Sequence, residues 1–335
     1  MTHGKLWPVH PKPMRDELLS SWIVRVIQAN GVKLQTVTRM LFGENISPWM
    51  RDIDRTPPDW LVDTFCLNTG VDRDTAYQAT LKSYKQKLFH RNRISGHQQW
   101  ILTLRQAGTK RRAYGQQFCS ACLSDDPVPY FRKQWRIALF TYCPAHQIEL
   151  YDACPNCGMP VIFYRVDFGR DVKEATPIFV CYECGYDLRL AVGKSVYFPN
   201  GELEIMYDSV LNSLCDSECE KSLYDLGFFV VLHQIIKVMS ARVNQGRLFD
   251  YVLGQVNIPN LQKYRGRITI EERRRSERHS LILSSLWLMA DLNQRLYGAW
   301  KEKAVRYNLL TKDLDTAPKW YEKFLCSISD WRASG

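Results

Sequence analysis

Four pairs of cysteine and histidine residues in the middle of the chain share one spacing, with two other residues between the members of each pair. This spacing lets one tight turn present two ligands to a tetrahedral ion such as Zn²⁺. Because a short segment joins the second pair to the third, we predict two sequential sites rather than an interleaved arrangement. The predicted sites are Cys119, Cys122, Cys143 and His146, followed by Cys154, Cys157, Cys181 and Cys184.

Both predicted sites have the composition of structural metal centres. Four protein ligands leave no open coordination position for a reactive water, so each ion would serve to fold its segment. Gly158 and Gly185 each follow the second cysteine of a pair, where a residue without Cβ readily adopts a positive φ. Apolar segments between the ligands have strand composition, and they are Trp135–Tyr142, Val161–Tyr164 and Ile178–Val180.

The remaining thiols carry weaker signals. Cys66 and Cys326 are expected to pack in the core, and Cys215 and Cys219 lie one helical turn apart with no second pair nearby. We therefore predict no metal site at Cys215 and Cys219. The reactive-site alternatives are also weak, because Gly193-Lys194-Ser195 resembles the end of a phosphate-binding loop but Leu188 replaces its leading glycine. The sequence thus favours a non-enzymatic protein.

The charge of the chain is concentrated near its N-terminus. The 335 residues carry a formal net charge of +10 and are 24% charged, a composition typical of soluble globular proteins with two or three domains. Most of the excess lies in residues 1–124, and no Asp or Glu occurs from Thr75 to Ser124. A basic region of this kind is typical of surfaces that bind phosphate backbones, and a solvated basic surface is the alternative.

Helical periodicity organises this basic region. It predicts helices over Leu18–Ile27, Leu34–Phe42, Asp59–Asn68 and Arg73–Leu88. The last two are joined by a short glycine-containing turn, which is the layout of a helix-turn-helix and also of an ordinary helical hairpin. The candidate DNA-contacting residues here and downstream are Arg73, Gln78, Lys82, Lys85, Arg91, Arg93, Lys110, Arg111 and Arg112.

The C-terminal third also has helical patterning. Helices are predicted over Leu226–Arg242, Leu281–Trp300 and a last segment from Thr316 to Trp331. The longest apolar stretch, Leu226–Met239, is too short to cross a bilayer and contains His233 and Lys237. The N-terminus lacks a secretory pattern, so we expect a cytoplasmic protein with reduced thiols.

Several of these residues carry a resemblance to a known family. The segment Pro13-Met14-Arg15-Asp16-Glu17-Leu18-Leu19-Ser20-Ser21-Trp22-Ile23-Val24-Arg25 resembles the opening motif of the TniQ/TnsD family of transposon target-selection proteins. Residues 119–122, 129–136, 143–146 and 154–158 follow in that family's order, and the resemblance covers roughly residues 8–190.

The resemblance implies a non-enzymatic adaptor that selects the target site for DNA transposition. Its implied partners are DNA, directly or through an RNA-guided CRISPR effector complex, the AAA+ transposition regulator (TnsC/TniB-like), and a second copy in a homodimer. It also implies a helix-turn-helix beside the zinc fingers, zinc at the eight ligands named above, and association with the bacterial nucleoid when the protein is bound to DNA. Arg132 and Arg136 would face nucleic acid or pair with Asp125 and Asp126.

Together these inferences predict a mainly α fold with a small amount of β structure. The expected domains are a helical one with the helix-turn-helix at 1–116, tandem zinc-ribbon or finger modules at 117–198, and a helical domain at 199–335. The expected cofactor is two structural Zn²⁺ ions. A zinc-dependent transcriptional regulator that binds its operator alone is the main functional alternative, and a protein-interaction scaffold is another.

Overall fold

The computed structural model describes residues 6–44, 47–104, 113–165, 176–215, 224–241, 246–258, 268–312, 314 and 317–328. The chain divides into two compact units. The first comprises Met1–Lys85 and Asn92–Ser195, and the second comprises Gln86–Arg91 and Val196–Gly335. About half of the structure is helical and few residues form strands, which confirms the mainly α fold with small β elements. The expected segments 1–116 and 117–198 lie almost entirely within the first unit.

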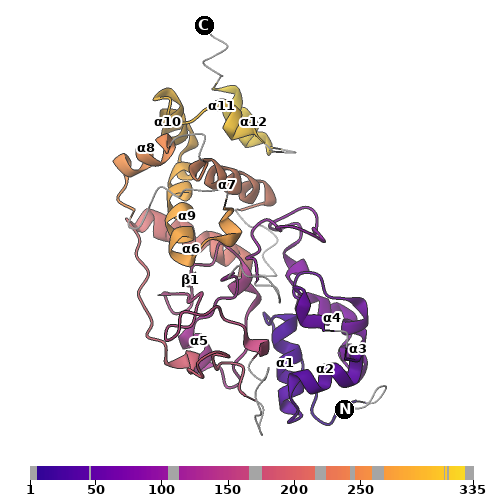
Figure 1. Ribbon diagram of the computed structural model, residues 1–335. Coiled ribbons are helices and arrows are strands. Elements are labelled where there is room, and N and C mark those ends of the chain that lie inside the picture. Colours follow the sequence, from indigo (N-terminus) through magenta and orange to yellow (C-terminus); the bar gives the residue numbers. More distant parts are fainter. Residues whose placement is uncertain are drawn as a thin grey trace. The chain divides into compact units, whose positions relative to one another are not determined.

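The first unit begins with four helices, drawn in indigo in Figure 1. These are α1 (Leu19–Ala29), α2 (Leu34–Phe42), α3 (Asp59–Thr69) and α4 (Arg73–Gln78), with a 3₁₀ turn at Pro48–Met50. Helix α1 is buried from Leu19 to Ile27. Helix α3 follows Pro58 and ends at Gly70, which has the left-handed conformation that its sequence position requires.

Helix α4 is shorter than the periodicity predicts. The expected helix over Arg73–Leu88 is wrong beyond Gln78, and a separate 3₁₀ turn covers Leu81–Tyr84. Thr80 lies between the two, where its hydroxyl donates to the Tyr77 carbonyl and accepts the backbone N–H of Lys82. A threonine that satisfies neighbouring backbone groups in this way competes with the helical hydrogen bonds and stops the helix.

The middle of the chain contains little regular structure. Its elements are α5 (Ser120–Asp125), a two-residue hairpin of β1 (Tyr142–Cys143) and β2 (Ile148–Glu149), and 3₁₀ turns at Lys133–Arg136, Phe163–Arg165 and Leu188–Leu190. The predicted strands Trp135–Tyr142, Val161–Tyr164 and Ile178–Val180 are therefore largely wrong. Their apolar side chains fill the core instead, as where the Phe131 and Phe163 rings stack with centroids 4.3 Å apart. Burial alone does not distinguish a strand from a packed loop.

The second unit is helical. Its helices are α6 (Gly201–Cys215), α7 (Leu226–Met239), α8 (Arg247–Gln255), α9 (Arg275–Ala290), α10 (Tyr297–Lys301), α11 (Tyr307–Thr311) and α12 (Lys319–Cys326), with a 3₁₀ turn at Ile270–Glu272 and a short π-helix at Leu292–Leu296. Helix α7 begins where predicted because the side chain of Asp225 caps it, accepting the N–H of Phe228 at 2.8 Å.

Two predicted C-terminal helices have different bounds. The expected helix Leu281–Trp300 begins earlier, at Arg275, and is interrupted after Ala290. Asp291 explains the break, because its side chain accepts the N–H of Gln294 and caps the next turn. The last helix begins after Pro318, and the predicted ends of that segment, Thr316 and Trp331, lie outside the described residues.

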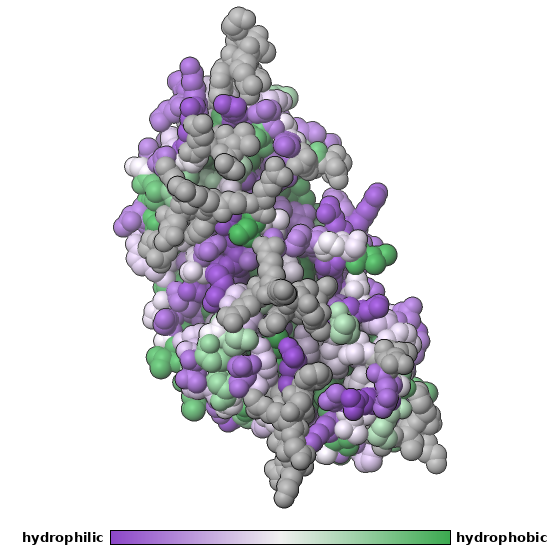
Figure 2. Space-filling view, viewed as in Figure 1, coloured by the Kyte–Doolittle hydropathy of each residue, from purple (hydrophilic) through white to green (hydrophobic). Residues whose placement is uncertain are grey.

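The surface of the protein carries both hydrophobic and hydrophilic side chains. Figure 2 shows hydrophobic side chains exposed among hydrophilic ones on the face that it displays. Among the described residues, no helix combines the length and the apolar character that crossing a membrane requires.

Candidate functional site

The first cluster of ligand residues converges in the first unit. The ligand atoms of Cys119, Cys122, Cys143 and His146 all lie within 4.8 Å of one another. The Nδ1 atom of His146 is 3.3 Å from the Cys122 sulfur and 3.5 Å from the Cys143 sulfur. Zinc held at about 2.3 Å from sulfur and about 2.0 Å from nitrogen in a tetrahedron places its ligands about 3.5–3.8 Å apart. The structure brings these residues together in the grouping that the sequence predicts, and their spacing fits one ion.

Short local elements hold these ligands in place. Cys119 precedes α5 as its N-cap, and its sulfur accepts the backbone N–H of Cys122 at 3.4 Å. Cys143 ends β1, and the turn that returns to β2 carries His146. On the other side of the imidazole, Nε2 lies 3.0 Å from a carboxylate oxygen of Asp125, the last residue of α5. This contact selects the tautomer that leaves Nδ1 free to bind a metal ion.

The second cluster has the same arrangement with four sulfurs. The sulfurs of Cys154 and Cys184 are 3.7 Å apart, as are those of Cys157 and Cys181. Each half is a turn closed by a glycine with positive φ. Gly158 (φ 69°) donates its N–H to the Cys154 carbonyl, and Gly185 (φ 75°) donates to the Cys181 carbonyl. The glycine positions predicted from the sequence therefore have the expected conformation.

The first cluster forms the same kind of turn with a residue other than glycine. Gln147 follows His146 with a φ of 52°, and its N–H donates to the Cys143 carbonyl at 2.8 Å. It thus occupies the position that Gly158 and Gly185 hold in the second cluster. The sequence carries no signal for this residue, because a side chain other than Gly or Asn rarely adopts the left-handed region.

The chemistry of the thiols favours a bound cation. Hydrogen bonds with Cys119 and Cys122 lower the pKa of Cys143 to about 2, whereas hydrogen bonds with Cys119 and Cys143 raise the pKa of Cys122 far above its usual range. The shared hydrogen bonds thus shift the pKa values of neighbouring thiols in opposite directions. A divalent cation removes this conflict, since metal binding ionises all of its thiol ligands. Both clusters could hold metal ions and are compatible with zinc.

The N-terminal motif residues form a buried network beside these clusters. The Glu17 carboxylate is completely buried, and Arg25 donates to both of its oxygens at 2.8 and 2.7 Å. The Ser21 hydroxyl also donates to Glu17 at 2.8 Å. A paired and hydrogen-bonded charge of this kind fixes the start of α1 relative to the preceding chain.

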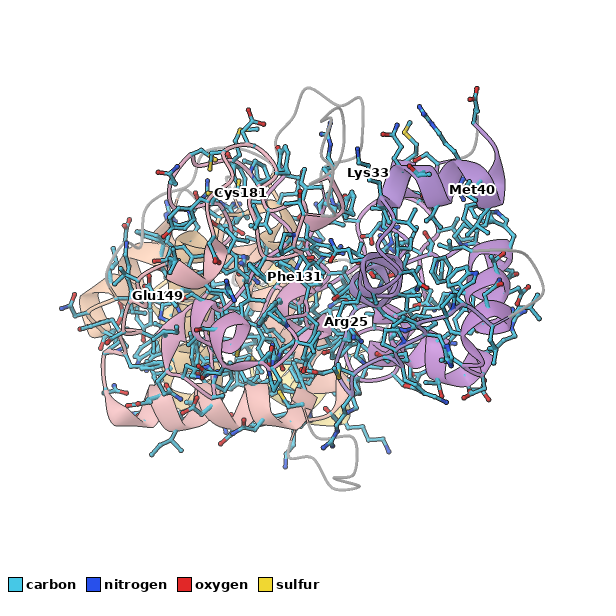
Figure 3. All side chains as sticks on the ribbon, turned by 90° about the horizontal axis from the view of Figure 1, so that it is seen from below. Arg25, Lys33, Met40, Phe131, Glu149 and Cys181 are labelled. Atoms are coloured by element: carbon cyan, nitrogen blue, oxygen red, sulfur yellow. The ribbon has the colours of Figure 1, made fainter. Side chains whose placement is uncertain are left out.

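The second motif, residues 129–136, joins this network. The N–H of Leu18 donates to the Phe131 carbonyl at 2.9 Å, and the N–H of Lys133 donates to the Asp16 carbonyl at 2.7 Å. Figure 3 labels Arg25 on α1 and Phe131 in this segment. The two motifs are far apart in the sequence, and their backbone pairing explains why the segments expected as separate domains lie in one unit.

A buried aspartate adds further contacts between the N-terminal part of the chain and residues 129–136. We call this set of contacts the junction. The Asp54 carboxylate accepts both the backbone N–H and the hydroxyl of Ser20 at 2.8 Å. Arg136, also completely buried, pairs with Asp54 at 3.3 Å and with Asp52 at 2.6 Å. Burial raises the pKa of Asp54 to about 6, against the opposing effect of the Arg136 charge. Sequence reasoning missed Asp52 and Asp54, because nothing in their spacing relates them to a residue so far along the chain.

Arg132 pairs with Asp126, which is one of its two predicted alternatives, whereas the prediction for Arg136 needs correction. Arg136 is inaccessible to nucleic acid, and its partners are Asp52 and Asp54 rather than Asp125 and Asp126. Arg132 is 12% exposed and forms a bidentate pair with Asp126 at 2.8 and 2.9 Å. Its third contact is Asp16 at 3.3 Å. Both guanidinium groups therefore hold the junction together.

The other candidate DNA contacts occupy varied positions. Arg73 is half-exposed and pairs with Asp59 and Asp63. Lys82 is half-buried with its ammonium 4.9 Å from the centre of the Tyr77 ring. The exposed candidates are Gln78, Lys85 and Arg93 in the first unit and Arg91 in the second. Lys110, Arg111 and Arg112 lie outside the described residues, and so does Cys219.

The geometry thus defines a mainly helical protein with two clusters of four Cys or His ligands, and buried ion pairs join the segment within the first cluster to the N-terminal part of the chain. Residues 8–150 match the model of the TniQ family. The family is a non-catalytic accessory of DNA transposition. The match includes both motifs and the first cluster, whereas the second cluster and residues Val196–Gly335 of the second unit lie beyond it. A search of curated proteins found no match.

Proposed function

We propose that this chain is a target-selection adaptor for DNA transposition. It binds target DNA, or an RNA-guided complex on that DNA, and recruits the AAA+ ATPase regulator that admits the transposase. The observation that carries this proposal is the TniQ match over residues 8–150. The buried contacts between the two motifs support it, because they show that the matched segments pack together in one folded unit.

In this proposal the two clusters bind structural zinc. The eight ligands would hold two ions with no position left for water, so zinc would fold the modules and take no part in a reaction. The contact between Asp125 and His146 supports zinc in the first cluster, because ligating histidines usually donate their second nitrogen to a carboxylate. No catalytic residues are proposed.

The proposed DNA-contacting residues are Lys85 and Arg93 in the first unit, with Gln78 and Lys82 beside them. Lys85 and Arg93 are exposed and belong to the acid-free stretch between Thr75 and Ser124. Arg91, Lys110, Arg111 and Arg112 belong to the same stretch of sequence. Arg73 contributes less, because Asp59 and Asp63 already neutralise its charge.

Binding of a labelled DNA duplex at increasing salt concentration tests the proposed DNA binding. Affinity should fall steeply with salt, because each phosphate contact releases about one counterion. Replacing Lys85 and Arg93 by Glu should reduce both affinity and its salt slope, whereas the same change at exposed Lys323 of α12 should have little effect. Absence of binding at low salt, or equal effects in the two variants, contradicts direct DNA contact.

Co-purification tests the proposed recruitment of the AAA+ ATPase regulator. The tagged chain should retain an AAA+ ATPase encoded beside it, and the complex should survive nuclease treatment. A regulator that binds an operator alone would bind DNA in the first assay and retain no ATPase in the second. That pattern would replace the adaptor by the transcriptional alternative.

A further inference from the structure

Helix α3 exposes large apolar side chains on its outer face. Leu61, Val62 and Phe65 of this helix are buried, while Trp60 is 41% exposed and Leu67 is 58% exposed. Residues seven positions apart lie on the same face, two turns and about 10 Å along the helix axis. The exposed pair is therefore aligned along the helix rather than scattered around it.

Residues from outside the helix extend this face at both ends. The ring of Phe42 lies 4.5 Å from that of Trp60. At the other end, Leu6 is 57% exposed, and one of its methyl carbons lies 3.3 Å from the point where a Cβ on Gly70 would be. The backbone N–H of Trp7 donates to the Asn68 carbonyl at 2.9 Å and holds Leu6 there. We call Leu6, Phe42, Trp60 and Leu67 the α3 stripe.

Acidic side chains surround the α3 stripe. Asp59 is 77% exposed and Asp63 is 50% exposed. Asp72 and Asp74 are also exposed, at the start of α4. Arg73 is the only basic residue in the sequences of α3 and α4, and it is paired with Asp59 and Asp63. The helical hairpin thus carries a net negative charge.

A surface that combines exposed apolar side chains with carboxylates is unsuited to a phosphate backbone, because the carboxylates repel the phosphates. It suits a positively charged partner with apolar side chains of its own. An amphipathic helix that docks on such a surface presents its first and last anchors at i and i+7, about 10 Å apart, which is also the separation of Trp60 and Leu67 along α3. Flanking Lys or Arg side chains would meet Asp59 and Asp63.

We infer that the α3 stripe is the docking site for a basic amphipathic helix of a protein partner. The α3 side of the hairpin is then a protein-binding surface, and the proposed nucleic acid contacts at Lys85 and Arg93 lie outside α3 and α4. This inference goes beyond the proposed function, because it requires neither DNA binding nor transposition.

Fluorescence anisotropy with a labelled 18-residue helix of Leu and Lys, with Leu along one face, tests the inference directly. The whole chain should bind this peptide and not its counterpart in which Glu replaces Lys. Leu67→Glu should weaken binding at least tenfold, and Asp59→Asn with Asp63→Asn should weaken it several-fold and reduce its salt dependence. Ile205→Glu is the matched control, because Ile205 is 69% exposed on helix α6 of the other unit.

The outcomes separate the inference from its competitors. Equal peptide affinity in the wild type, Leu67→Glu and Ile205→Glu proteins overturns it, provided that their melting temperatures agree. Loss of duplex binding in Leu67→Glu with peptide binding unchanged also overturns it, because the hairpin would then contact DNA. A chain that binds the peptide through Leu67 but binds no DNA supports the docking site and contradicts direct DNA contact.

Discussion

The Nε2 atom of His146 lies 3.0 Å from a carboxylate oxygen of Asp125, while its Nδ1 atom faces the sulfurs of Cys119, Cys122 and Cys143. Helix α5 therefore supplies one ligand, Cys122, from its first turn and the residue that orients another ligand from its last position. A six-residue helix that does both couples its own position to metal binding.

This relationship predicts a graded loss of metal affinity. Asp125→Ala should weaken zinc binding at the first cluster by roughly 10–100-fold, because the histidine loses the partner that fixes its tautomer and ring orientation. Asp125→Asn should have a smaller effect, since an amide oxygen still accepts the Nε2 proton. Competition with a chromophoric chelator measures both, and the second cluster serves as the internal control. Equal affinities in all three proteins would show that the contact is incidental.

The metal content follows from the ligand sets. Native mass spectrometry should find two zinc ions in the wild-type chain and one in Cys119→Ala or Cys154→Ala, because each ion needs its four ligands. Each substitution should also lower the unfolding temperature of the first unit, since binding stabilises the fold that presents the ligands.

Cys215→Ser provides the control for that measurement. Cys215 is exposed and belongs to neither cluster, so this variant should retain two ions. A wild-type chain with less than one zinc ion, or a Cys215→Ser chain that loses one, would contradict the assignment of ligands.

The buried ion pairs predict unequal costs for arginine substitutions. Arg136→Met leaves the buried Asp54 carboxylate without its cation and should lower the free energy of unfolding by about 3–5 kcal/mol. Arg73→Met removes a half-exposed pair and should leave stability unchanged within error. Urea unfolding of the three proteins makes the comparison. If the two variants were equally stable, Arg136 would not hold the junction as described.

Asp54 gives a pH dependence with a definite sign. Its pKa is about 6 in the folded chain and 3.8 in the ordinary reference state, so the folded chain binds the proton more tightly. The stability that this proton contributes is fully present below 3.8 and is lost as pH rises through 6. The ¹³C carboxyl resonance that disappears in Asp54→Asn should titrate near pH 6. A midpoint at or below the reference value would contradict the effect of burial.

The sequence predicted those parts of the structure that depend on local spacing. The ligand pairs, the glycine turns at Gly158 and Gly185, and the start of α3 after Pro58 all follow from neighbours in the chain. The TniQ resemblance likewise rested on contiguous motifs, and the family match over residues 8–150 confirms it.

Features that depend on distant residues escaped prediction. Arg136 looked like a surface cation because its partners, Asp52 and Asp54, come from a loop far earlier in the chain. The strand-like segment Val161–Tyr164 runs into the 3₁₀ turn Phe163–Arg165 instead of forming a strand, and its first three side chains are buried. The negative charge of the α3–α4 hairpin was not predicted, because the acid-free stretch that begins within α4 suggested a basic surface.

Mapping of transposon insertions in cells tests the central claim most directly. With the wild-type chain present, insertions should cluster at the selected target, and deletion of the gene should abolish them or disperse them. Cys119→Ala, which removes a ligand of the first cluster, should reproduce the deletion, and Cys215→Ser should behave like the wild type. An unchanged number and distribution of insertions after deletion would contradict a role in target selection.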